Sequence, residues 1–176
     1  MVKNCFAIRG EMRRLLNTMK QSPALAHAQT QMAPGVITRE GFLGPDTRPL
    51  GDILEADDAR VKRLGLTHAA IAARMRELRD AGKRGLGLST EVEPHFDVQV
   101  ESIRGRLPSP FGGRGVFSKT TTMVTNTRLN ESVQYSDLQI HLVGVHGFYE
   151  GRNSKYRLDP EMLARVLEVE PVTPTD

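Results

Sequence analysis

Two histidines in the segment 136–151 are the residues best placed to do chemistry. His141 and His146 lie five positions apart, and glycines, aromatic residues and charged groups follow them directly. Imidazole nitrogens bind metals and exchange protons near neutral pH, so this density of special residues indicates a site. The pattern does not name a reaction. It leaves open a zinc site, a structural hydrogen-bonded pair and a metal-free binding site.

The zinc interpretation rests on the spacing of His141 and His146, which resembles the histidine half of a Cys2His2 site. The cysteine half is missing, because Cys5 is the only cysteine. On an ideal α-helix the two side chains would point about 140° apart, so they share a metal only if Gly144 loosens the last turn. A zinc-dependent enzyme that uses His95, His141 and His146 is therefore an alternative. The preferred interpretation needs no cofactor.

Cations follow the histidines in the segment 151–157, ahead of a helix that is expected to begin at Pro160. Cations and the positive end of a helix hold carboxylate or phosphate groups. The sequence therefore favours a binding or interaction module, with a site around His141–Gly151 for a small anionic ligand or a protein partner. The expected ligand contacts are His141, His146, Tyr149, Arg152, Lys155 and Arg157.

Other motifs fail on inspection. Residues 113–120 look like a phosphate-binding loop, but Ser118 stands where the motif needs glycine, and a Thr-rich strand follows instead of a helix. Residues 66–74 resemble the first helix of a helix-turn-helix unit, but the helix continues to Gly82 without a recognition helix. No convincing nucleophile is present either, so the sequence leaves open whether the chain is an enzyme.

The positive net charge of the chain, +3, comes from its N-terminal arm. In residues 1–31 five basic residues against Glu11 give +4, which leaves −1 for the remainder. Nucleic acid is therefore not expected as a partner, except for weak binding through residues 1–31. A nucleic-acid-binding regulator that uses this basic arm is the second alternative function.

The cysteine content and the hydrophobic pattern suit a cytoplasmic protein without a membrane partner. A single cysteine allows no intramolecular disulfide, as is usual in a reducing compartment. No apolar run reaches the roughly 18 residues that a membrane span needs. Residues 1–35 are expected to be a poorly ordered basic arm and linker, residues 36–170 a single α+β domain, and residues 171–176 a frayed tail. The pattern does not define an oligomeric state.

The domain is predicted to begin with a helical hairpin. Apolar residues at helical spacing predict one helix over 50–64, with Asp57 and Asp58 on its solvent side. Gly65 ends it, and Thr67 caps a second helix over 68–81.

A small antiparallel sheet and one or two C-terminal helices complete the prediction. Strands are expected over 96–101, 116–125 and 132–135, with a tight connection over 126–131. A capping box, Ser136 and Gln139, favours a helix over 136–146 in spite of its β-branched residues. Asp159 and Pro160 begin the last helix. The predicted fold class is α+β, with the helical hairpin packed on the sheet.

Overall fold

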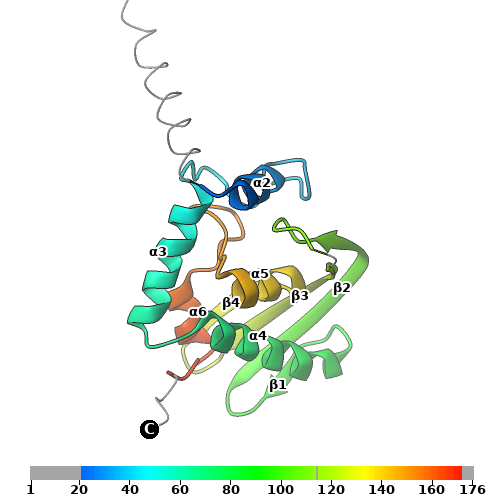
Figure 1. The fold of residues 1–176 in the computed structure, drawn as a ribbon. Coiled ribbons are helices and arrows are strands. Elements are labelled where there is room, and N and C mark those ends of the chain that lie inside the picture. The colour runs from blue at the N-terminus through cyan, green and yellow to red at the C-terminus, as the bar shows by residue number, and fades with distance from the viewer. Residues whose placement is uncertain (1–20, 114, 172–176) are drawn as a thin grey trace, which may run out of the picture.

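Four antiparallel strands form a sheet in which each strand pairs with its neighbour in the sequence (Figure 1). The computed structural model describes residues 21–113 and 115–171. The alternating pattern that predicted the first strand places Phe96 and Val98 in the core and leaves Asp97 and Gln99 partly exposed. The predicted tight connection pairs Asn126 with Glu131. The strands are β1 (Thr90–Val92), β2 (Phe96–Pro108), β3 (Val116–Asn126) and β4 (Glu131–Ser136).

Helices α4 (His68–Gly82) and α5 (Asp137–His146) cover one face of this sheet (Figure 1). Both approach their neighbours closely at a glycine. A Cβ atom on Gly82 would lie 2.4 Å from a methyl carbon of Val98, and one on Gly144 would lie 2.8 Å from the Cβ of Ala72. Gly144 therefore serves helix packing, and α5 continues as an α-helix to its last residue.

The predicted capping box is present at the start of α5. The Ser136 hydroxyl accepts from the backbone N–H of Gln139 at 3.2 Å, and the Gln139 side chain accepts from the N–H of Ser136 at 2.9 Å. Ile140 faces the main core, while Leu142 faces a second apolar cluster on the other side of the helix. A helix buried on both sides tolerates β-branched residues that an exposed helix would disfavour.

The remaining helices flank this arrangement. The turn between α3 (Leu50–Arg63) and α4 is as predicted, with Gly65 at φ 68° and the Thr67 hydroxyl accepting from the N–H of Ala70. The α+β class is confirmed, but the hairpin packs differently from the prediction. Only α4 lies along the sheet, whereas α3 packs mainly against α2 (Pro23–Gln31) and α6 (Pro160–Val166). No helix of the described residues has both the length and the hydrophobicity to cross a membrane.

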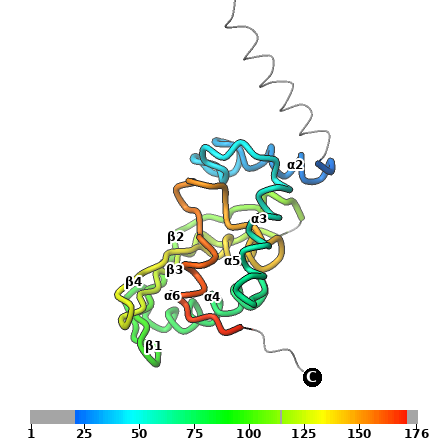
Figure 2. Tube along the Cα trace, turned by 90° about the vertical axis from the view of Figure 1, so that its left-hand side faces the viewer, coloured from blue at the N-terminus to red at the C-terminus, as the bar shows by residue number. Residues whose placement is uncertain are grey.

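The segment 21–35 differs from its interpretation as a linker. It contains α2, and Ala28 and Met32 lie in the second apolar cluster. The Gln29 side chain accepts from the N–H of Leu50 and donates to the carbonyl of Arg48, which ties α2 to the start of α3. Figure 2 shows α2 and β1 at opposite ends of the molecule. Residues 1–20 of the predicted basic arm lie outside the described residues.

Candidate functional site

The loop after α5 (residues 147–159) packs closely against residues 42–46 through backbone contacts. Gly147 ends α5 in the left-handed conformation. The N–H of Gly151 donates to the carbonyl of Phe42 at 2.9 Å, and a Cβ atom on Gly151 would lie 2.2 Å from the carbonyl oxygen of Leu43. A Cβ atom on Gly44 would similarly lie 2.7 Å from the Cα of Ser154. Only glycine allows these contacts, so they hold the loop at a fixed position opposite α3.

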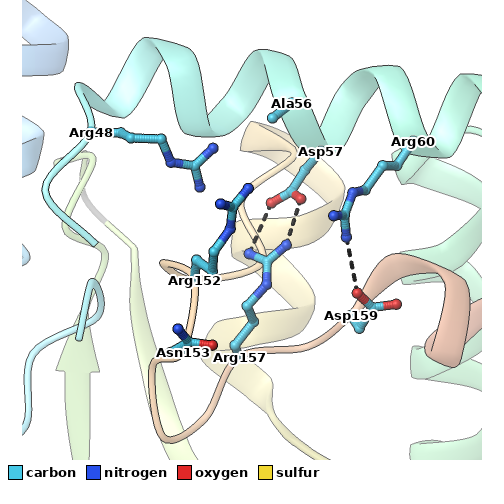
Figure 3. A pocket seen from close by; sticks show the side chains of 8 residues that line it. All are labelled: Arg48, Ala56, Asp57, Arg60, Arg152, Asn153, Arg157 and Asp159. Carbon is cyan, nitrogen blue, oxygen red and sulfur yellow. Dashed lines mark hydrogen bonds and ion pairs between the residues drawn. The ribbon is translucent and has the colours of Figure 1, made fainter. Parts of the chain in front are cut away.

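A cavity of about 440 Å³ lies between α3 and this loop, and we call it the arginine pocket (Figure 3). Its arginines come from three separate segments: the residues before α3, α3 itself and the loop. The pocket is lined by Arg48, Ala56, Asp57, Arg60, Arg152, Asn153, Arg157 and Asp159.

Arg157 is held by a buried ion pair at the back of the pocket. Two guanidinium nitrogens donate to the two carboxylate oxygens of Asp57, at 2.6 and 3.1 Å. A third contact goes to the backbone carbonyl of Glu150. Asp57 is only 2% exposed, which corrects the expectation that it lies on the solvent side of its helix. A pair with both partners aligned in this way fixes the orientation of the guanidinium group.

Arg48 is held by a second two-point pair, with Asp46. Its Nε donates at 2.9 Å and a terminal nitrogen at 2.6 Å. The carboxylate of Asp46 also accepts from the backbone N–H groups of Arg152 and Arg48. Burial alone would raise the pKa of Asp46, but these hydrogen bonds lower it to about 2. The carboxylate therefore stays ionised and joins the loop to the start of α3.

The remaining two arginines differ in their partners. Arg60 pairs with Asp159 at 3.1 Å, whereas Arg152 makes no ion pair with any residue that the structure describes. In Figure 3 the side chain of Arg152 points from the loop toward α3. Asp159 also caps α6 through the N–H groups of Glu161 and Met162, so this helix end is already occupied. The first N–H groups of α6 therefore already have a carboxylate partner within the chain.

Glu150 lies on the other side of the loop, where it lines a neighbouring cavity of about 610 Å³. It is 3% exposed and takes a positive φ of 70°. Its carboxyl oxygens accept from the Gln139 side chain at 2.9 Å and from the Ser154 hydroxyl at 2.7 Å. Burial raises its pKa to about 7, although these hydrogen bonds and the charge of Arg157 oppose the shift. Lys155 lines this cavity instead of the arginine pocket.

His141 and His146 belong to an aromatic cluster at the end of α5. His146 stacks on Phe111 with ring centroids 4.0 Å apart, and His141 stacks on Phe117 at 4.4 Å. The two imidazole rings are 5.3 Å apart. No hydrogen bond joins either ring to another described residue, so the expected structural hydrogen bonds are not found. Burial lowers the pKa of both histidines, and for His146 the charge of His141 adds to this.

His95 lies far from these two histidines, so the proposed zinc ligands do not converge. His95 bonds Glu168 at 2.8 Å beside the start of β2. His141 stacks on Phe117 of β3, which pairs with Leu107 near the far end of β2. At about 3.3 Å per residue, Leu107 lies roughly 35 Å along β2 from the start of that strand. Within residues 21–113 and 115–171 no group of three or more His, Cys, Asp or Glu side chains could hold a metal ion.

Tyr149, another expected ligand contact, is buried instead. Its hydroxyl bonds Nδ1 of His68 at 2.9 Å, and Nε2 of His68 bonds Asp58 at 3.2 Å. Burial raises the pKa of the Tyr149 hydroxyl. This chain of contacts secures the loop to α3 and α4, and nothing in the sequence near His68 pointed to it.

Of the expected ligand contacts, the structure thus places Arg152 and Arg157 in the arginine pocket. Sequence reasoning missed Arg48, Arg60 and Asp57, although Arg48 stands in the turn-forming segment 44–49 next to the start of α3. Comparisons with protein-family models, with curated proteins and with solved structures find no match for this chain.

Proposed function

We propose that this chain is a binding module that holds a small anionic ligand in the arginine pocket. The main support for the proposal is that four guanidinium groups line one cavity, whereas only three of them form an ion pair with a described carboxylate. Guanidinium groups bind carboxylate and phosphate through paired N–H donors. Arg152 is the surplus cation, so it is the expected primary contact of the ligand.

The ion pairs of the pocket support binding instead of competing with it. Each guanidinium group carries five N–H donors, and Asp46 uses two of those on Arg48. The others stay available to a ligand. Because Arg48 and Arg157 are already oriented, binding does not have to order them, which favours affinity. A cavity of about 440 Å³ also lies in the usual size range of small-molecule sites.

Calorimetric titration of the full chain with inorganic phosphate and with citrate tests the proposal. The variant Arg152→Gln removes the unpaired guanidinium, and Arg128→Gln is the control, because Arg128 pairs with Glu168 beside the turn between β3 and β4. A hydrogen bond to a charged group contributes about 1.5–3 kcal/mol, so binding should weaken about 10- to 100-fold in Arg152→Gln only. Equal affinities in the two variants, or no binding of either probe, would contradict the proposal.

A further inference from the structure

The β2–β3 hairpin carries positive charge that the arginine pocket does not use. Residues 102–130 contain no Asp or Glu, although the whole chain has 21 acidic residues. The neutral balance of the domain therefore hides a strongly uneven distribution. The cations of this stretch are Arg104, Arg106, Arg114, Lys119 and Arg128.

Three of these cations gather at a β-bulge in the hairpin. The pairing passes from Ile103 with Lys119 to Arg106 with Ser118, so two residues of β2 are left without a partner. One of them is Gly105, where a Cβ atom would lie 3.3 Å from the Cδ and Cε of Lys119 and 3.6 Å from its Nζ. The ammonium group of Lys119 therefore lies over the bulge. We call Arg104, Arg106 and Lys119 the bulge cluster.

The bulge cluster has no internal counter-charge. All three side chains belong to exposed residues. The ion pairs found in the described part of the chain, such as those of Arg128 with Glu168 and Arg165 with Glu131, include none of the three. Three exposed cations on one ribbon without a described carboxylate partner create a positive potential that an anionic partner would offset.

We propose that the bulge cluster binds the phosphate backbone of duplex nucleic acid. A two-stranded antiparallel ribbon has the dimensions that the DNA major groove admits, and cations along it contact phosphates on the groove walls. Arg104, Arg106 and Lys119 all project from such a ribbon. The proposal concerns a surface separate from the arginine pocket and does not depend on a ligand there.

Two features favour duplex nucleic acid over other anionic partners. Single-strand binding relies on aromatic side chains that stack on bases, but Phe111 and Phe117 already stack on the histidines of α5. A lipid surface needs a sizeable apolar area to insert. The hairpin end instead buries Ser109 and Pro110, and its two exposed aliphatic residues, Ile103 and Val116, do not pair with each other across the strands.

Fluorescence anisotropy with a labelled DNA duplex and the full chain tests the proposal. The triple variant Arg104→Ser, Arg106→Ser, Lys119→Ser removes the bulge cluster. The matched control Lys62→Ser, Arg63→Ser, Arg76→Ser lowers the net charge equally at exposed positions of α3 and α4 and leaves the hairpin intact. The variant Arg104→Lys, Arg106→Lys keeps the charge and should keep the binding, which guards against loss of folding as the explanation.

The salt dependence gives the expected size of the effect. Each phosphate contact adds about 0.9 to the slope of log affinity against log salt, so three contacts add about 2.7. Raising the salt from about 50 to 200 mM should therefore weaken binding by about 40-fold through these three contacts. The bulge-cluster variant should lack this part of the salt dependence, and the control variant should retain it. Equal loss in both triple variants would overturn the proposal, and so would unchanged binding. Tighter binding of a single strand, or of phosphatidylserine vesicles, through the same three residues would also overturn it.

Discussion

Replacing Glu150 by glutamine is expected to stabilise the protein at alkaline pH. Glu150 is 3% exposed, and burial raises its pKa to about 7 from the ordinary value of 4.5. Its carboxyl accepts from Gln139 and Ser154. A glutamine amide has nearly the same shape and preserves these contacts, because its oxygen accepts from Gln139 and its nitrogen donates to the Ser154 hydroxyl. The substitution therefore removes the titration with little change in packing.

The direction of the pH dependence follows from whether the folded or the unfolded state binds the proton of Glu150 more tightly. Between pH 4.5 and about 7 the folded protein holds a proton on Glu150 that the unfolded chain releases, so rising pH favours unfolding. Below pH 4.5 the carboxyl is neutral in both states. A tenfold difference in proton affinity is worth about 1.4 kcal/mol, so the free energy of unfolding should fall by about 3 kcal/mol across this window. Glu150→Gln should not show this contribution.

Urea unfolding at a series of pH values from 4 to 9 measures the effect. The difference between Glu150→Gln and the unmodified protein should grow with pH and level off above about 7. Glu55→Gln is the control, because Glu55 is exposed on α3 and should leave the pH profile unchanged. A difference that stays constant with pH, or a variant that is less stable than the unmodified protein at pH 8, would show that burial does not raise the pKa of Glu150 in the folded protein.

Three further substitutions test other parts of the structure. Asp57→Asn leaves the largely buried guanidinium group of Arg157 without its charged partner and should lower the free energy of unfolding by about 3–5 kcal/mol, whereas Asp52→Asn at an exposed position of the same helix should cost at most about 1 kcal/mol. Met32→Ala should cost about 2–5 kcal/mol in urea unfolding, and a change below about 1 kcal/mol would favour the linker interpretation. His146→Phe should weaken the loss of stability below pH 6.5, because burial lowers the pKa of His146 and the unfolded chain binds protons more strongly. An unchanged acid limb in pH-dependent melting would contradict the last expectation.

The elements that sequence predicted well are those whose signals are local. The capping box of α5, the Thr67 cap of α4 and the Asp159 cap of α6 each depend on residues within one helical turn. Period-two alternation likewise marked the start of β2. The short strand β1 and helix α2 were missed. β1 has only three residues, too few for a periodic pattern, whereas α2 is held by contacts with distant residues, as when Gln29 bonds the start of α3.

The candidate site was predicted only in part for the same reason. Arg152 and Arg157 stand in a visible run of cations, but the carboxylate that orients Arg157 lies 100 residues earlier in the sequence. Asp57 looked like a solvent residue because its neighbours are charged. His141 and His146 are close in the sequence and in space, but Phe111 and Phe117 from the hairpin take the positions next to their rings. The density of histidines, aromatic residues and cations in the segment 136–157 pointed to the region of the candidate site. The partners of these residues come from distant segments of the chain, which the sequence pattern does not reveal.

The ion pair of Arg157 and Asp57 helps to explain why charged residues, and not apolar ones, line the arginine pocket. Replacing such a pair by apolar residues of similar volume is often neutral or stabilising, so stability alone does not explain it. What the pair provides is a guanidinium group fixed in orientation, with Asp57 on one side and the Glu150 carbonyl on the other. Apolar residues could fill the same space but could not present N–H donors to the cavity. The pair is therefore best understood as the support of the arginine pocket.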